Sequence, residues 1–276
     1  MKKMPKWLYF TVMAVLLIVF LVSAASIIRY FVESRQAQDI YDDLADMVQQ
    51  AKPAPTDPPE EEETPLPPVS PYVTVTHPKT GQPVEVLPEY APIFQLNGDI
   101  VGWIYIPGTN INYPVMQTGP ETTDYYLRRD FYGNYSTHGC IYAREQCDVF
   151  APSDNITIYG HRMQDQTMFG QLAKYERKDF CSENSLIYFD TLKERHTYQI
   201  VKVFKTSVSI GSSFYYHLYE DFSTEEEFQE FMNQCDQKSL YTTGVSAQYG
   251  DKLITLSTCE YTLGNGRLVI VAKRIA

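Results

Sequence analysis

The sequence predicts a mainly β protein: a closed or nearly closed β-barrel with inserted helices, preceded by an N-terminal transmembrane helix and a linker. Three observations lead to this prediction. They are an uncharged apolar run near the N-terminus, a segment rich in proline and glutamate, and a series of short alternating segments over about 190 residues. Of the 276 residues, 44% are hydrophobic and 21% are charged, a composition that excludes wholesale disorder.

The balance of charge excludes one class of partner. The chain carries a net charge of −11, with 34 acidic and 23 basic residues. Nucleic-acid binding needs a basic footprint. We therefore expect no nucleic-acid partner.

The apolar run extends from Trp7 to Ile28 and contains no charged residue. A helix rises about 1.5 Å per residue, so the run spans ~33 Å, enough to cross a hydrocarbon core of about 30 Å. Three lysines precede the run and Arg29 follows it. The positive-inside rule then predicts a single-pass anchor with a cytoplasmic N-terminus and the rest of the chain outside the cell.

A cleaved signal peptide is the alternative interpretation of this run, with the small residues 23–26 as its cleavage site. The run is longer than the usual signal core of roughly 7–15 residues, which favours the retained anchor. Both interpretations export the rest of the chain.

The residues after the anchor divide into a stalk and a folded domain. Ile40, Leu44, Met47 and Val48 lie on one stripe of a helix and predict a short juxtamembrane helix over 34–50. Residues 52–71 contain eight prolines and four consecutive glutamates, a composition typical of an extended spacer. We therefore expect an anchor at 1–30, a juxtamembrane helix and spacer at 31–88, and the folded domain at 89–276.

Within the domain, short segments alternate between apolar and polar residues or consist of β-branched and aromatic residues. We expect strands at 101–106, 111–115, 155–159, 198–208, 252–257 and 268–273. One helix is expected at 223–237. Ser223 to Glu226 form a capping box, and Phe228, Phe231, Met232 and Cys235 then mark one apolar face.

Five cysteines are present, and an odd number in an exported chain leaves at least one free thiol. Cys140 and Cys147 are close enough in sequence to pair across a short loop, whereas Cys235 is expected in the core. We expect no metal site, because the sequence has no CxxC pair and its histidine and cysteine spacings fit no zinc pattern. His196 and His217 lie among polar and tyrosine-rich residues and are expected at the surface.

A first candidate nucleophile is Cys140, in the segment Thr137-His138-Gly139-Cys140. This segment resembles the nucleophile motif of L,D-transpeptidases, which cross-link peptidoglycan through a cysteine. That family also has a His-Gly pair upstream, and residues 117–132 contain no histidine. The interpretation stays open as an alternative, with Cys140 and His138 as its reactive pair.

A second candidate is Cys259, which ends a predicted strand, with Arg267 beginning the next and His161 following an earlier one. A free thiol has a pKa near 8.5 and reacts as its thiolate, so a nearby imidazole can take the proton and later supply one to a leaving amine. A guanidinium keeps its charge and can stabilise the oxyanion of a tetrahedral intermediate. The competing interpretation is that the three side chains are unrelated.

The motifs around Cys259 and His161 carry a resemblance to a known family. Thr255-Leu-Ser-Thr-Cys259 with Arg267, together with Tyr159-Gly-His161, is similar to the signature of sortases, the cysteine transpeptidases of Gram-positive cell surfaces. The likeness covers about residues 94–273, and the helix at 223–237 points to class B. The resemblance implies a closed sortase-type barrel of about eight strands, with Cys259 as nucleophile, His161 as general acid and base, and Arg267 as oxyanion or substrate-backbone donor.

The resemblance also implies a substrate groove. Leu127, Ser257 and Glu260 fall where class B enzymes line the groove for the sorting signal, and the loop from Ser207 to Tyr219 is expected to contribute to the choice of signal. Class B enzymes take NP-x-T-N-like or PP-x-T-G-like signals. Arg162 departs from the family pattern, in which asparagine or histidine is common after the histidine.

The expected activity is cleavage of a C-terminal pentapeptide signal of secreted proteins after threonine, followed by covalent attachment to peptidoglycan. Expected partners are these secreted proteins, peptidoglycan or its precursor as amine acceptor, and membrane lipid through the N-terminal helix. We expect no cofactor. Besides the L,D-transpeptidase interpretation, a non-catalytic surface binding module remains as an alternative.

Overall fold

The computed structural model describes residues 6–53 and 70–276, so two of the three N-terminal lysines and most of the expected spacer lie outside the described residues. The first element is α1 (Lys6–Ala51), one continuous helix. The sequence predicted a membrane-spanning helix and a juxtamembrane helix over 34–50; both segments are helical, and they form one helix without a break. Neither glycine nor proline interrupts residues 29–33, and an ion pair of 2.7 Å joins Arg29 to Glu33 one turn later.

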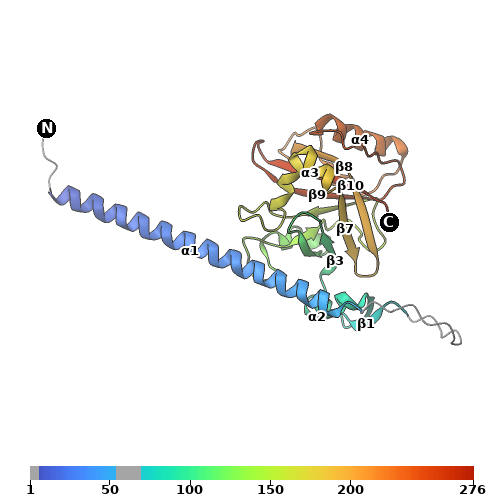
Figure 1. Cartoon of the computed structure of the whole chain (residues 1–276), viewed down its shortest axis with the longest axis horizontal. Helices are drawn as coiled ribbons and strands as arrows, with labels where there is room; N and C mark the ends of the chain where they lie inside the picture. Colours follow the sequence, from blue (N-terminus) through green and yellow to red (C-terminus); the bar gives the residue numbers. More distant parts are fainter. Residues whose placement is uncertain (1–5, 54–69) are drawn as a thin grey trace.

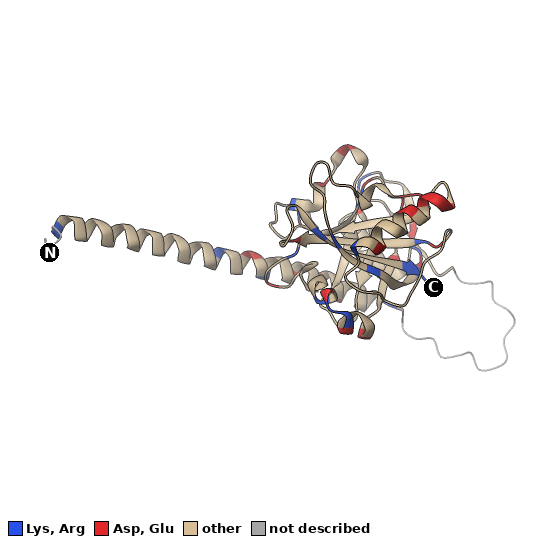
Figure 2. Cartoon of the chain, turned by 90° about the horizontal axis from the view of Figure 1, so that it is seen from above, with Lys and Arg blue, Asp and Glu red and all other residues tan. Residues whose placement is uncertain are grey.

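The two halves of α1 have different surroundings. The first half projects away from the rest of the protein (Figures 1 and 2). Its apolar side chains are exposed. Among the described residues, α1 is the one helix long and apolar enough to cross a membrane. Its second half packs on the domain through a stripe of buried side chains: Ser34, Ala37, Tyr41, Leu44 and Val48.

A small hairpin precedes the barrel, inside the segment assigned to the spacer. Strands β1 (Val73–Thr76) and β2 (Pro83–Val86) pair antiparallel, followed by η1 (Pro88–Tyr90) and α2 (Ala91–Leu96). The ring of His77 packs edge-on against Phe94 of α2, with 5.4 Å between ring centroids. The hairpin therefore packs on the domain, while the boundary at residue 89 stays a prediction.

Eight strands form a closed barrel, which confirms the predicted architecture. They are β3 (Ile100–Tyr105), β4 (Asn112–Met116), β5 (Ile141–Ala143), β6 (Asn155–Tyr159), β7 (Leu186–Thr191), β8 (Arg195–Ser207), β9 (Leu253–Glu260) and β10 (Gly266–Arg274). The order around the barrel is β10-β8-β7-β3-β4-β5-β6-β9. The pairs β4–β5 and β6–β9 are parallel, and the others are antiparallel. The sequence predicted all of these except β5 and β7.

Six further helices lie in the connections between the barrel strands. They are η2 (Pro120–Thr122), η3 (Tyr125–Arg128), η4 (Gly170–Glu176), α3 (Lys178–Glu183), η5 (Tyr216–Leu218) and α4 (Glu225–Lys238). The four apolar residues predicted for one face of α4 are all buried, in a second core between this helix and the barrel. Its cap is one residue later than expected: the Thr224 hydroxyl accepts from Glu227 N, and the Glu227 carboxylate accepts from Ser223 N.

All five cysteines lie in described residues and are free thiols, so Cys140 and Cys147 form no disulfide here. Four are buried: Cys140, Cys147, Cys181 and Cys235. Cys259 alone is partly exposed.

Candidate active site

The strand pairing brings three distant parts of the sequence to one end of the barrel. Cys259 of β9 and Arg267 of β10 are direct partners across their antiparallel ladder. Directly opposite residues share one face of a sheet. The parallel pair β6–β9 aligns Tyr159 with Ser257, and His161 and Cys259 each follow two residues later. The three predicted catalytic side chains therefore lie at or just beyond the ends of adjacent strands.

These three side chains line one cavity of about 210 Å³. Leu127 and Ser257, predicted to line the substrate groove, also contribute to its wall. The expected loop from Ser207 to Tyr219 supplies further wall residues: Val208, Tyr216 and His217. Residues that the sequence singled out in five separate segments thus surround a common space.

Hydrogen bonds hold the backbone at His161 and at the residue before it. The Thr258 hydroxyl donates to the carbonyl of Gly160 at 2.8 Å, and Phe169 N donates to the carbonyl of His161 at 2.9 Å. A side chain at Gly160 would clash, because an added Cβ would lie 2.5 Å from the Ile141 side chain and 2.7 Å from the Phe169 ring. Glycine before the histidine is therefore required by packing.

The imidazole of His161 has one nitrogen committed to the protein. Nε2 lies 2.8 Å from the carbonyl oxygen of Leu127. A carbonyl only accepts, so Nε2 carries the proton and Nδ1 is left as the basic nitrogen of the neutral ring. Burial lowers the pKa of His161 below 6.5, partly opposed by the Leu127 hydrogen bond and aided by the positive charge of Arg128. The neutral ring, able to accept a proton at Nδ1, is favoured at neutral pH.

Arg267 is the second residue of β10, directly after a tight turn. Its Nη1 donates to the Gly266 carbonyl at 2.9 Å. Asn265 adopts the left-handed conformation at φ 49°, and a Cβ on Gly266 would lie 2.6 Å from the carbonyl oxygen of Glu260. This turn fixes where the guanidinium enters the cavity.

Glu260 does not line the cavity, contrary to the predicted groove position. Its side chain is 1% exposed, and its carboxylate accepts hydrogen bonds from Thr262 N at 2.9 Å, Leu263 N at 3.1 Å and Lys205 Nζ at 3.2 Å. Burial alone would raise the pKa of Glu260, but the hydrogen bonds from Thr262 and Lys205 outweigh it and lower the pKa to about 2. The structure gives Glu260 a role in holding the β9–β10 turn.

Of the two histidines expected at the surface, one is buried and the other lines the cavity. His196 is 9% exposed and packs edge-on against Tyr198. His217 lines the cavity, where burial, together with Arg144 and Arg267, lowers its pKa. The sequence showed only that His217 follows three aromatic residues, and that pattern did not separate a cavity wall from a surface loop.

Arg162, which departs from the family pattern, lies outside the cavity wall. Its guanidinium lies over the ring of Tyr261 at 5.6 Å, and the Tyr261 hydroxyl donates to the Arg162 carbonyl at 3.2 Å. Its Nη1 is 3.4 Å from the Glu176 carboxylate. Arg162 therefore ties the loop after His161 to the β9–β10 turn.

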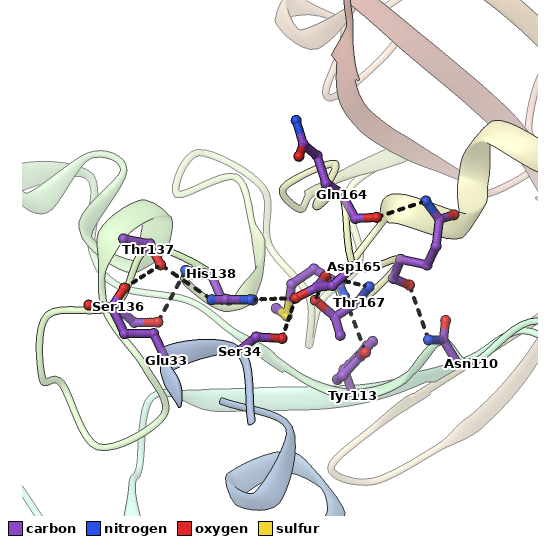
Figure 3. A network of polar contacts seen from close by, with 12 residues as sticks. Glu33, Ser34, Asn110, Tyr113, Ser136, Thr137, His138, Gln164, Asp165 and Thr167 are labelled. Carbon is purple, nitrogen blue, oxygen red and sulfur yellow. Dashed lines mark hydrogen bonds and ion pairs between the residues drawn. The ribbon is translucent and has the colours of Figure 1, made fainter. Parts of the chain in front are cut away.

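The other Cys/His pair does not form a reactive site. Cys140 is 1% exposed, and burial raises the pKa of its thiol far above the usual range. The Tyr41 hydroxyl of α1 covers it, 3.3 Å from the sulfur. The ring of His138 instead donates from Nε2 to Asp165 at 2.9 Å (Figure 3). A nucleophile needs access and a thiolate, so this arrangement argues against the L,D-transpeptidase interpretation.

Comparisons with known proteins agree with this geometry. The sequence model of the Sortase domain matches residues 104–275. Sortase B of Staphylococcus aureus (strain NCTC 8325 / PS 47) is 32% identical over 192 residues, covering 69% of this chain and 76% of the relative. Sortase B of Listeria monocytogenes serovar 1/2a is 31% identical over 193 residues, with the same coverage.

Solved structures are similar over most of their length. The S. aureus sortase B–substrate complex superposes with a TM-score of 0.68 at 28% identity, covering 88% of this chain and 98% of that one. Sortase B from Bacillus anthracis in complex with AAEK1 gives a TM-score of 0.67 at 28% identity, covering 89% and 99%. The chain therefore belongs to the sortase family of cysteine transpeptidases, and its relatives identify it as class B.

Proposed function

We propose that this sortase cleaves a C-terminal sorting signal of secreted proteins after threonine and joins them to an amine of peptidoglycan or its precursor. The observation that supports this most is the single cavity lined by Cys259, His161 and Arg267. The three side chains supply a nucleophile, a proton carrier and a fixed positive donor, which together meet the needs of acyl transfer.

In the first half-reaction, the Cys259 thiol gives its proton to His161, and the resulting thiolate attacks the carbonyl carbon of the threonine. A C–S bond forms, and the carbonyl oxygen takes up negative charge in a tetrahedral intermediate. The C–N bond then breaks as the imidazolium of His161 gives its proton to the leaving amine. The products are a thioester on Cys259 and a peptide with a new amino terminus.

The second half-reaction reverses these steps with a different amine. The acceptor amine attacks the thioester carbon and loses a proton to the now neutral His161. The C–S bond breaks, and the Cys259 thiolate leaves with a new amide bond formed. Nδ1 is the ring nitrogen available for both transfers, because Nε2 is held by Leu127.

Arg267 is the proposed stabiliser of the oxyanion in both intermediates. Its guanidinium approaches from the strand directly beside Cys259, and it is permanently charged. Leu127 and Ser257 are proposed to contact the signal beside the scissile bond. The segment 207–219, which lines the same cavity, is proposed to select among signals.

The proposed location follows from α1. We infer that its apolar half spans the cell membrane with the N-terminus in the cytoplasm and the catalytic domain outside. Arg29 follows the apolar run alone, whereas three lysines precede it.

A cleavage assay on the full chain tests the proposal. Fluorogenic peptides carrying an NP-x-T-N-like or a PP-x-T-G-like signal would be incubated with the native chain and with the Cys259→Ala and Cys140→Ala variants. We expect cleavage after threonine of at least one peptide by the native chain and Cys140→Ala, and none by Cys259→Ala. Activity that depends on Cys140 would instead support the L,D-transpeptidase alternative.

A further inference from the structure

An exposed tyrosine stands beside the point where α1 ends its apolar run. Tyr135 lies in the loop after η3 and is 71% exposed, and Tyr132 of the same loop is 51% exposed. Tyr135 and Arg29 line one surface hollow of about 280 Å³ between this loop and α1. Tyr135 is therefore level with the first charged residue that follows the run.

The apolar surface of α1 continues a little beyond Arg29. Phe31 is 64% exposed and Val32 is 49% exposed. Leaving such side chains in water costs about 1.5–3 kcal/mol each relative to full burial. Long arginine side chains reach the headgroups from within the apolar region, so Arg29 is compatible with a bilayer boundary near Val32.

The domain is fixed to α1 immediately after that boundary. The Ser34 hydroxyl donates to Asp165 at 2.5 Å, and Asp165 also accepts from His138 at 2.9 Å. The Thr137 hydroxyl donates to Glu33 at 3.4 Å (Figure 3). Because a helix rises about 1.5 Å per residue, Ser34 lies only ~3 Å beyond Val32 along the axis. The loops that contact α1 therefore begin at headgroup level.

These contacts hold the loop firmly. Burial alone would raise the pKa of Asp165, but hydrogen bonds from Ser34, Thr167 and His138 outweigh it and lower the pKa to about 2. Further along α1, the Tyr41 hydroxyl donates to the Gly139 carbonyl at 2.7 Å. The loops around residues 137–139 and 165 therefore contact α1 at several positions between residues 33 and 41.

We propose that Arg29, Tyr132 and Tyr135 form an interfacial patch that sits in the phospholipid headgroup layer of the bilayer that α1 spans. Tyrosine is suited to this layer, because its ring is apolar and its hydroxyl is polar. The Arg29 guanidinium donates to Glu33 through Nε, and its Nη groups would meet lipid phosphate oxygens. The patch seats the catalytic domain on the membrane, and this depends on α1 as an anchor and not on the proposed reaction.

The cavity of the active site is close to this patch in the chain. Leu127, which lines the cavity and holds His161, is followed by Arg128 and Arg129, and Arg129 pairs with Tyr135 in an isolated β-bridge. Insertion of the patch into the headgroup layer would therefore keep Cys259 near the membrane surface.

Photo-crosslinking in the membrane tests the proposal. The full chain would carry p-benzoylphenylalanine at position 135 and be reconstituted into vesicles of phosphatidylcholine and phosphatidylglycerol. The matched control is position 249, a tyrosine that is 43% exposed and whose hydroxyl lies near the Phe222 carbonyl before α4. Figure 1 shows α4 on the side of the domain away from α1.

We expect a phospholipid adduct at position 135, identified by mass, and none at position 249. Absence of a lipid adduct at 135, an equal yield at 249, or an adduct to a second copy of the chain would overturn the proposal. None of these outcomes depends on catalysis, so the result is separable from a failure of the proposed function.

Hydrogen exchange provides an independent measurement. With the full chain in lipid nanodiscs, Tyr135→Ser should speed the exchange of backbone amides over 131–137, whereas Tyr249→Ser should leave them unchanged. Both side chains are exposed, so the melting temperature should not move. Unchanged exchange in Tyr135→Ser would contradict the patch.

Discussion

Cys259 of β9 and Arg267 of β10 are direct cross-strand partners, with seven residues between them in the sequence and adjacent positions in the ladder. Their relative position is therefore set by backbone hydrogen bonds of the barrel and not by a long loop. Residues on strands are held more accurately than residues on loops. This pair gives the proposed reaction its fixed electrostatic partner.

Replacing Arg267 by glutamine should lower kcat/KM for signal cleavage by about 10²–10³-fold, the usual loss for one oxyanion donor. The loss should fall mainly on kcat, since the charge develops in the transition state. Arg274→Gln, near the other end of β10, is the matched control and should retain activity. Equal activity of Arg267→Gln and the native chain would remove Arg267 from the mechanism.

The pH dependence of cleavage should reflect the lowered pKa of His161. Burial is its main cause, and the positive charge of Arg128 adds to it. A lowered pKa means that the ring loses its proton at a lower pH, so the acidic limb of kcat/KM should lie below 6.5. Arg128→Gln removes a nearby positive charge and should move this limb toward higher pH.

The neighbouring variant Arg129→Gln is the control for this shift. Its guanidinium lies over the Tyr125 ring at 4.7 Å. We expect its pH profile to match that of the native chain. Salt should also reduce the Arg128 effect, because Arg128 is exposed and its charge is screened. A limb that stays in place in Arg128→Gln would contradict the electrostatic part of this account.

Thiol labelling should distinguish an enzyme from a binding module that only keeps the barrel. Four cysteines are at most 4% exposed, whereas Cys259 is partly exposed in the cavity. A methanethiosulfonate reagent at neutral pH should therefore add one label to the folded chain, at Cys259, and five after unfolding. An unlabelled Cys259 in folded protein would favour the binding module.

Glu260 should stabilise the fold in a pH-dependent way. Its pKa is about 2 in the folded protein against 4.5 ordinarily, so its contribution is present above pH 4.5 and fades as pH falls toward 2. Glu260→Gln should lower the free energy of unfolding by about 2 kcal/mol at pH 7, because it weakens hydrogen bonds to a buried carboxylate. The exposed Glu230→Gln on α4 should have little effect. Urea unfolding at pH 7 and near pH 2 measures both, and an equal loss at the two pH values would contradict this account.

The parts of the fold that follow from local pattern were predicted well. Alternation of apolar residues identified β6, β8, β9 and β10, and the capping residues identified α4. Strand β5 was missed because it has three residues, too few for a period to appear. The continuity of α1 was missed because the sequence was divided at the charge of Arg29, although helix geometry allows a charged residue there.

The candidate site was predictable only in part, for a physical reason. Cys259, His161 and Arg267 were recognised by a motif whose residues the barrel aligns through backbone pairing. His217 and Glu260 depend on how individual side chains orient, and the sequence does not contain that information locally. Glu260 follows the nucleophile, yet its carboxylate turns into the β9–β10 turn because three donors lie there.

The most direct test is to trap the acyl-enzyme. The full chain would be mixed with a sorting-signal peptide without an amine acceptor, quenched in acid after a short time, digested and analysed by mass spectrometry. The account predicts that the peptide fragment ending in threonine is attached to Cys259, and that His161→Ala greatly reduces its yield. An acyl group on Cys140, or cleavage by the native chain with no adduct on Cys259 at any time, would contradict the central claim.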